Sequence, residues 1–459
     1  MTTDSAAGGA FDRGLLATLT RREQSRFADR HPRSAAAYAR ADSLFGRVPM
    51  TWMNKNPAGH PVYADRARGN RLTDLDGNEF VDFCLGDTAA MAGHSPAPVV
   101  AAVTRRLAEL GGASLMLPTE DAAVVGAELA RRFGLPAWSF ALTATDANRW
   151  AIRLLRAASG RPRILVNSYC YHGSVDESLI VVGPDGRGVS REGNVGAPGD
   201  VTETSRVAEF NDLAGLEREL AHGDVAAVLM EPALTNIGIV LPEPGYLAGV
   251  RELTRRSGTY LVNDETHTFS AGPGGATAAW GLSPDVVTIG KAIGGGIPVG
   301  AYGLSAELAG ELLGRNDLDL VDMGGVGGTL AGNPVSMAAT RATLEEVLTA
   351  AAFEHMIAVA DEFAAGVRKI IDGYGLPWSV SQVGARVEYR FAAPAPRTGT
   401  ESAGRADAAL EDFLHLYLLN RGILLTPFHN MALMCPQTTV EDVARHHEIF
   451  SAALGELLA

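Results

Sequence analysis

"TYLVNDE" (residues 259–265) is a short apolar run, rich in β-branched residues, that ends on two adjacent carboxylates. A second such run, "VVTIGK" (286–291), ends on a lysine. Apolar runs of this length, bounded by turn residues, are typical of buried strands. Ligands of open α/β sheets bind outside the carboxyl ends of the strands. We therefore expect Asp264, Glu265 and Lys291 to mark a functional site.

Lysine is rare in this chain. The 39 basic residues include only three lysines, Lys55, Lys291 and Lys369. A lysine amine forms Schiff bases with carbonyl compounds, including pyridoxal phosphate (PLP), which arginine cannot do. Lys291 ends a predicted strand beside the flexible "AIGGGIP" segment, whereas Lys55 lies in a polar loop and Lys369 in a predicted helix. Lys291 is the candidate for chemistry, with an ordinary exposed lysine as the alternative.

Asp264 is the candidate partner for a protonated ring nitrogen. A pyridine nitrogen stays protonated only beside a carboxylate, and PLP needs that proton to withdraw electrons. A metal-binding carboxylate or a helix cap is the alternative for this residue. A nucleotide site is disfavoured because the chain contains no GxxxxGK[ST] motif.

Three further stretches could contact a phosphate or a flat ring. "ALTATDANRWAIRLLR" (141–156) passes from a predicted strand into a helix, and helix N-termini bind phosphates. In "CYHG" (170–173), Tyr171 could stack on a ring, and "GGTLAGNP" (327–334) is a glycine-rich loop. A plain helix cap, a core tyrosine and an ordinary loop are the respective alternatives.

Strands and helices alternate through the middle of the chain, which predicts an α/β domain with a mostly parallel sheet over residues 91–335. Residues 1–90 are predicted to be helical and then to form a hairpin around the Asp76-Gly77 turn. We expect this segment to pack with a smaller C-terminal domain, residues 336–459.

The overall composition excludes several classes of protein. The net charge of −14 argues against nucleic acid or an anionic membrane as the main partner. The three cysteines form no CxxC pair and no disulfide framework, so neither a cysteine metal site nor an oxidising compartment is expected. No apolar run approaches the ~18 residues of a membrane span. These features predict a soluble, cytoplasmic protein without a metal.

Taken together, these stretches resemble the class III, fold-type I, PLP-dependent aminotransferases, from about Gly46 to the C-terminus. The most similar branch is the one that includes glutamate-1-semialdehyde aminomutase and β-amino-acid aminotransferases. The family motifs D-E-[VT], G-K, E-P-x-x-x-N, Y-H-G and G-T-x-x-G-N-P are matched by Asp264 to Thr266, Gly290-Lys291, Glu231 to Asn236, Tyr171 to Gly173 and Gly328 to Pro334.

The resemblance implies a large domain with a mostly parallel seven-stranded sheet, a small α/β domain and PLP as cofactor. It assigns catalytic roles to Lys291, which would form the Schiff base and move the proton, to Asp264 and to Tyr171. The cofactor-binding residues that it implies are Ala144, Thr145, Tyr171, Glu231, Asn236, Asp264, Thr266, Lys291 and Thr329. Thr329 is expected to reach the cofactor of a neighbouring subunit, so the resemblance also implies a homodimer with shared active sites.

The chain departs from the family pattern at several positions. Ala144 stands where the family has a glycine, which is tolerable only if φ is negative there. Trp52 occupies the position of the aminomutase's carboxylate-binding arginine, and Asp87 that of a pocket tryptophan. Trp52, Asp87 and Arg386 are the candidate substrate-binding residues, with Arg47 and Arg390 as further carboxylate candidates. Surface ion pairs are the alternative for each arginine.

Our main functional hypothesis from the sequence is ping-pong transamination, in which an amino donor passes its amino group to an oxo acid through Lys291. An intramolecular 1,2-aminomutase of the glutamate-1-semialdehyde type is the alternative within the class. A non-catalytic binding protein is disfavoured by the retained Lys291, Asp264 and Tyr171. A nucleotide-binding dehydrogenase is disfavoured because "GKAIGGGIP" lacks GxGxxG spacing.

Overall fold

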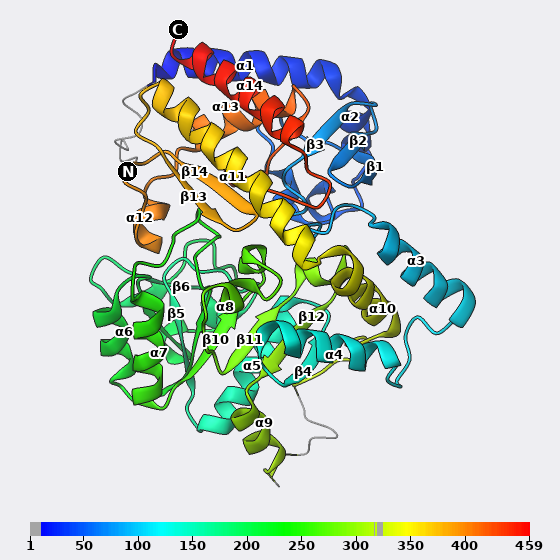
Figure 1. The fold of residues 1–459 in the computed structure, drawn as a ribbon. Helices are drawn as coiled ribbons and strands as arrows, with labels where there is room; N and C mark the ends of the chain where they lie inside the picture. Colours follow the sequence, from blue (N-terminus) through cyan, green and yellow to red (C-terminus); the bar gives the residue numbers. More distant parts are fainter. Residues whose placement is uncertain (1–10, 316, 319–324) are drawn as a thin grey trace. The chain divides into compact units, whose positions relative to one another are not determined.

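The computed structural model describes residues 11–315, 317–318 and 325–459 of the chain (Figure 1). These residues form two compact units. The larger unit contains residues 96–354 and 396–403, and the smaller unit contains residues 11–95, 355–395 and 404–459. The larger unit therefore continues through residues 336–354, past the boundary expected at residue 335.

The larger unit is built on a seven-stranded sheet in the order β4-β12-β11-β10-β9-β5-β8. The strands are β4 (Ala137–Ala141), β5 (Arg163–Asn167), β8 (Ser205–Ala208), β9 (Val225–Met230), β10 (Tyr260–Asp264), β11 (Val286–Ile289) and β12 (Gly300–Leu304). Only β12 runs antiparallel to its neighbours, which confirms the mostly parallel seven-stranded sheet. A separate two-stranded sheet pairs β6 (Ile180–Val182) with β7 (Gly188–Ser190).

The central strands form because their residues are apolar on both faces. Every residue of β9 and of β11 is buried, as expected for parallel strands covered by helices on both sides. The sequence did not predict β8, a short edge strand in which Arg206 is half-buried. The strand expected before the helix in 141–156 ends at Ala141, because Thr143 caps that helix.

Helices cover this sheet, and one of them positions the site. The helices of the larger unit are α3 (Ala97–Arg105), α4 (Glu120–Phe133), α5 (Ala144–Ser159), α6 (Leu213–Leu220), α7 (Tyr246–Ser257), α8 (Gly275–Ala279), α9 (Ala306–Leu313), α10 (Pro334–Ala342) and α12 (Gly399–Ala403). Helix α5 packs on β9, β11 and β12, and its buried residues include Ala151, Ile152 and Leu155. Burying a side chain such as Leu155 stabilises the fold by roughly 1.5–3 kcal/mol, and the packing holds the α5 N-terminus at the end of β4.

The smaller unit has two sheets and long helices. Strands β1 (Ala64–Arg68), β2 (Arg71–Asp74), β3 (Glu79–Asp82) and β15 (Ile423–Leu424) form one sheet, and β13 (Ser379–Val383), β14 (Arg386–Arg390) and β16 (Met431–Leu433) form the other. Its helices are α1 (Arg13–Arg30), α2 (Pro32–Ala39), α13 (Ala408–Leu419), α14 (Val440–Leu457) and most of α11 (Ala350–Gly373). Because β15 pairs with β3, the N-terminal hairpin and the C-terminal third share one sheet.

His446 on α14 is buried in an aromatic cluster of the smaller unit. Its ring stacks on Phe450, with ring centroids 5.6 Å apart, and tilts against Phe363 at 4.5 Å. Neither ring nitrogen has a hydrogen-bond partner among the residues that the structure describes. Burial, reinforced by the nearby His447, holds the pKa of His446 well below its usual value. The folded protein therefore keeps this imidazole neutral.

Replacing His446 by phenylalanine is expected to reduce the loss of stability in acid. In the unfolded chain His446 takes up a proton near a pKa of about 6.5, whereas the folded chain resists it. The unfolded state then binds more protons, so stability falls as the pH drops below about 7. Thermal unfolding midpoints of His446→Phe measured from pH 7 to 5 should fall less steeply. His222→Phe, at an exposed site, should show the same dependence of the midpoint on pH as wild type. If His446→Phe also showed the wild-type dependence, His446 would not be the buried neutral group that lowers stability in acid.

Candidate active site

Lys291 follows β11 through a sharp bend at the carboxyl end of the sheet. Gly290 is followed by Lys291 with φ of 50°, a left-handed conformation that costs roughly 1–3 kcal/mol and clusters at functional sites. A Cβ on Gly290 would lie 2.9 Å from the Ala144 nitrogen, so only glycine permits this approach to α5. The bend places the lysine next to the start of α5.

Asp264 ends β10 and is buried in a polar network. One carboxylate oxygen, Oδ2, accepts a hydrogen bond from Asn148 Nδ2 at 2.8 Å and lies 2.9 Å from His172 Nδ1. The other, Oδ1, accepts a hydrogen bond from the Thr266 backbone N–H at 3.0 Å. Burial raises the pKa of Asp264, but His172 and these hydrogen bonds outweigh burial and hold the pKa below its usual value. Asp264 is therefore an ionised carboxylate at the end of its strand.

The start of α5 has the arrangement expected of a phosphate site. Thr143 caps the helix by accepting the Asp146 N–H at 3.1 Å. Ala144 and Thr145 are the first two residues of the helix, where N–H groups have no intrahelical acceptor. Ala144 has helical backbone geometry and is not among the residues with positive φ, so alanine is tolerated in place of the family's glycine.

Two more glycines let neighbouring segments approach this helix start. A Cβ on Gly173 would lie 1.9 Å from Thr145 Oγ1, and a Cβ on Gly300 would lie 2.3 Å from the Thr143 carbonyl oxygen. Both distances are far below van der Waals contact. The segment 171–173 and strand β12 therefore pack directly against the first turn of α5.

Replacing Gly300 by alanine is expected to displace the start of α5. The added Cβ meets backbone atoms, and overpacking of this kind typically costs about 1–3 kcal/mol. We expect a lower thermal midpoint and weaker binding of phosphate-bearing ligands. Gly310→Ala in α9 is the matched control, because a Cβ added there would meet no neighbouring atom of the described residues within 4 Å and alanine favours a helix. Equal behaviour of the two variants would refute the steric argument.

Glu231 connects the strand β9 to the Tyr171 segment. It is buried, accepts the Tyr171 backbone N–H at 3.1 Å and accepts a hydrogen bond from the Thr235 hydroxyl. Burial raises the pKa of Glu231. The Tyr171 side chain itself is 41% exposed, which leaves ring surface available for stacking. Asn236 lies in the loop after β9 and is half-buried.

Thr266 and Thr329 differ in their surroundings. Thr266 is buried, and its Oγ1 has no hydrogen-bond partner among the described residues. A buried hydroxyl in that state is consistent with a ligand group as partner. Thr329 is exposed in the turn before α10, so its expected contact with a neighbouring subunit's cofactor stays a prediction.

The three candidate substrate-binding residues all belong to the smaller unit. Arg386 on β14 is 1% exposed, and its Nη2 lies 3.3 Å from Asp87 Oδ1 and 2.5 Å from Thr88 Oγ1. The structure thus brings Arg386 and Asp87 together as an ion pair. Trp52 lies on the short helix Thr51–Asn54, and its ring is edge-on to that of Phe428, with the ring centroids 5.9 Å apart.

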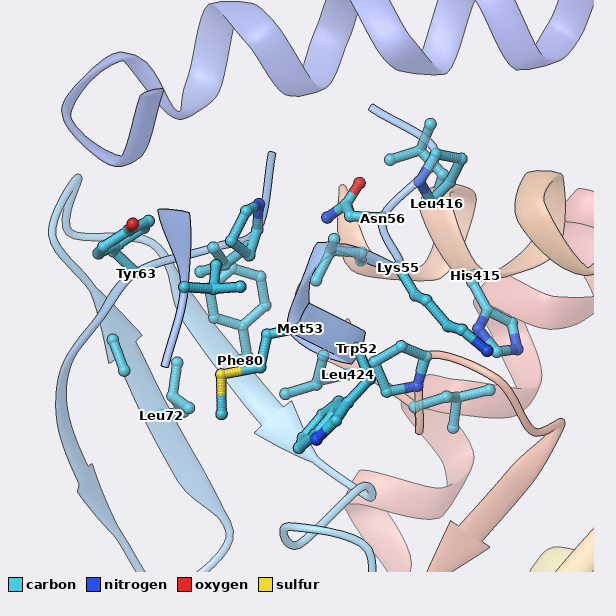
Figure 2. A pocket seen from close by; sticks show the side chains of 18 of the residues that line it. Trp52, Met53, Lys55, Asn56, Tyr63, Leu72, Phe80, His415, Leu416 and Leu424 are labelled. Carbon is cyan, nitrogen blue, oxygen red and sulfur yellow. The ribbon is translucent and has the colours of Figure 1, made fainter. Parts of the chain in front are cut away.

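Trp52 lines a mostly apolar cavity of about 380 Å³ in the smaller unit. Figure 2 shows its side chain together with those of Met53, Leu72 and Phe80 around this space. Lys55 also lines the cavity, with its Nζ 5.3 Å from the Phe428 ring centroid. The lining therefore combines a mostly apolar surface with the ammonium group of Lys55.

Sequence reasoning did not identify Asn148 and His267 as site residues. Asn148 is fully buried on the apolar face of α5, where it also accepts a hydrogen bond from Thr288 Oγ1 at 2.6 Å. The sequence did contain an indication of Asn148, because this polar residue lies one turn after Ala144 on a helix face that is otherwise apolar. His267 follows the Asp264-Glu265-Thr266 motif, and its Nε2 lies 2.9 Å from Lys291 Nζ.

The fold and site define a class of PLP enzyme, and comparisons with known proteins agree. The family model for class III aminotransferases matches residues 53–454. Glutamate-1-semialdehyde 2,1-aminomutase of Thermomicrobium roseum is 37% identical over 86% of this chain and 91% of its own length. The glutamate-1-semialdehyde 2,1-aminomutase of Neisseria meningitidis is 33% identical over 86% of this chain and 92% of its own length. The chain therefore belongs to the class III aminotransferase family.

Solved structures of glutamate-1-semialdehyde-aminomutases and of a transaminase are also similar to this chain. A glutamate-1-semialdehyde-aminomutase from Pseudomonas aeruginosa PAO1 is 49% identical, with a TM-score of 0.94 over 98% of this chain and all of that one. Its lysine-to-alanine variant in complex with PMP is 48% identical with the same TM-score. An omega-transaminase from Sphaerobacter thermophilus is 31% identical, with a TM-score of 0.84. The match covers 93% of this chain and 98% of that one.

The protein is a PLP-dependent enzyme of fold type I that acts on small molecules. The site residues fit this cofactor. The α5 N-terminus suits its phosphate, the ionised Asp264 its ring nitrogen and Lys291 its aldehyde, while Thr266 Oγ1 offers an unsatisfied hydroxyl. In the described part of the chain, no helix is long and apolar enough to cross a membrane.

Proposed function

We propose that the protein is an intramolecular aminomutase of the glutamate-1-semialdehyde 2,1-aminomutase type. The observation that carries the proposal is its similarity, over nearly its full length, to proteins of that name, including one at 49% identity. This support favours the aminomutase over the ping-pong aminotransferase that the sequence alone favoured. Both reactions require the same residues to hold the cofactor and move a proton.

When bound, PLP withdraws electrons from the carbon next to the substrate nitrogen. Asp264 keeps a proton at the ring nitrogen, because its carboxylate is held ionised in a buried site. Lys291 Nζ takes the proton from the substrate carbon and returns it to a second position. The N–H groups of Ala144 and Thr145 bind the phosphate and fix the orientation of the ring. From the family resemblance, Tyr171 and Thr266 would hold the ring between them, and Asn236 would contact its 3-hydroxyl.

An aminotransferase is the second candidate, and Trp52 is the observation that favours it. Trp52 takes the position of the aminomutase's carboxylate-binding arginine, and it lines an apolar cavity. Arg386, the other candidate for a substrate carboxylate, already pairs with Asp87. A substrate with an apolar end group would suit these residues better than glutamate-1-semialdehyde.

The two candidates are separated by supplying one substrate alone. Enzyme in its pyridoxamine phosphate form, given glutamate-1-semialdehyde and no oxo acid, should convert it to the 2,1-isomer if the protein is an aminomutase. An aminotransferase should instead form product only when both a donor and an acceptor are present. The visible spectrum of the cofactor, followed during each half of the reaction, reports which form accumulates. The aminomutase proposal would be refuted if the enzyme forms no isomer from the single substrate but turns over pairs of amino donors and oxo acceptors.

We also propose that the enzyme is a homodimer in which Thr329 serves the neighbouring subunit's cofactor. Mixing Lys291→Ala and Thr329→Ala chains tests this arrangement. If Thr329 acts across the interface, each mixed dimer has one intact site, and activity rises above that of either parent. If Thr329 acts within its own chain, no mixed dimer has an intact site and activity does not recover. Subunit exchange is checked by tagging one of the two chains.

A further inference from the structure

His267 makes a close contact with the catalytic lysine that the proposed mechanism does not use. Its Nε2 lies 2.9 Å from Lys291 Nζ, which is hydrogen-bond distance. His267 is 8% exposed, so the contact is largely shielded from water. A hydrogen bond in such a site is stronger than one in solvent.

The backbone that carries His267 is held on both sides. Before it, the Thr266 N–H donates to Asp264 Oδ1 at 3.0 Å, and the Glu265 N–H donates to the Thr288 carbonyl at 2.8 Å. After it, the short helix Thr268–Ala271 begins, and the Ser270 N–H donates to the His267 carbonyl at 3.3 Å. The position of His267 relative to β10 and β11 is therefore fixed by hydrogen bonds of the main-chain groups on either side of it and by the Asp264 carboxylate.

Glu265 strengthens this frame from the interior. It is fully buried, and its carboxylate accepts hydrogen bonds from Thr268 Oγ1 at 2.6 Å and from the backbone N–H groups of Ala276 and Thr277. These bonds fix the chain segment that surrounds His267 to helix α8. A rigid support of this kind is what a residue needs in order to orient a flexible neighbour.

We propose that His267 is a positioning residue for Lys291. A lysine side chain has four rotatable bonds, and a fixed hydrogen-bond partner removes most of that freedom before the amine reacts. Lys291 Nζ and His267 Nε2 share one proton in this hydrogen bond. Nζ donates to the neutral ring when the lysine is charged, and Nε2 donates to Nζ when the amine is neutral. The exchange needs no other reactant, and the inference rests on the role proposed for Lys291.

The test uses the capture of PLP by the apoenzyme, without any substrate. Methionine and glutamine have similar lengths, but only glutamine can hydrogen-bond to Nζ, so His267→Met and His267→Gln form a matched pair. We expect His267→Met to capture PLP about 10- to 100-fold more slowly than wild type, and His267→Gln to recover most of that loss. The captured fraction is measured by borohydride reduction and mass spectrometry. His222→Gln, at an exposed site, is the control for the substitution itself.

Equal capture rates in His267→Met and wild type would overturn the proposal, as would a His267→Gln variant as slow as His267→Met. If wild type itself fails to capture PLP, the proposed function fails instead, so the two failures are distinguishable. Should the His267 variants not fold, histidine-labelled protein gives a second measurement. The ¹⁵N shift of His267 Nε2 is expected to move when Lys291 is replaced by alanine, and an unmoved shift would refute the contact.

Discussion

Lys291→Ala is expected to abolish covalent attachment of PLP and to reduce turnover by about 10²- to 10⁴-fold, the contribution typical of a positioned acid–base group. The loss follows because alanine provides neither the amine that attaches to the cofactor nor the base that moves the proton. Attachment is measured by borohydride reduction followed by mass spectrometry. Turnover is measured with the substrate identified by the single-substrate experiment.

The chain offers its own control for this experiment. Lys369 is exposed on α11, so Lys369→Ala should leave both PLP attachment and turnover at wild-type levels. Because the chain has only three lysines, the attachment site can be assigned without ambiguity. Reducible attachment that persists in Lys291→Ala, at Lys55 or Lys369, would contradict the assignment.

Asp264→Asn is expected to lower turnover by about 10²- to 10³-fold while leaving the shape of the site intact. Asparagine keeps the size of the side chain and can still accept the Thr266 N–H, but it carries no negative charge. The ring nitrogen then loses the group that holds its proton. Single-turnover rates and the visible spectrum of the bound cofactor report this loss separately from substrate affinity.

The same substitution should destabilise the apoenzyme, because His172 loses its charged partner in a buried site. Breaking a buried pair in this way costs as much as about 3–5 kcal/mol when the remaining group stays charged. We expect a lower thermal midpoint without PLP. Asp185→Asn, an exposed aspartate in the turn between β6 and β7, is the control and should change neither quantity. Wild-type turnover in Asp264→Asn would show that this carboxylate does not hold the ring proton.

Much of the fold could be predicted from the sequence because its central strands are continuous apolar runs. Strands β10 and β11 begin and end within two residues of the runs 259–265 and 286–291, since a run buried on both faces differs clearly from the helices around it. The edge strand β8 was not predicted because it has only four residues, of which Ser205 and Arg206 are polar. The hydrophobic pattern of the sequence is a weak predictor of a strand that is neither fully buried nor long.

The site could be predicted in part for a similar reason. Asp264, Lys291 and Tyr171 each lie at or just after the end of a strand, and a parallel sheet brings such ends to one edge. Asn148 and His267 were missed because their roles depend on contacts across 116 and 24 residues of chain. The pairing of Arg386 with Asp87, 299 residues apart, could not be foreseen for the same reason.

The sequence by itself determined the class of this protein, because the motif residues and their spacing along neighbouring strands specify a PLP site. Only the tertiary structure decided which polar groups satisfy one another. Asp264 is ionised because His172 and Asn148 meet it inside the fold, Arg386 is engaged by Asp87, and Lys291 Nζ lies against His267. Hydrogen bonds and ion pairs act over about 3 Å, and distances that short between residues distant in sequence are set by packing.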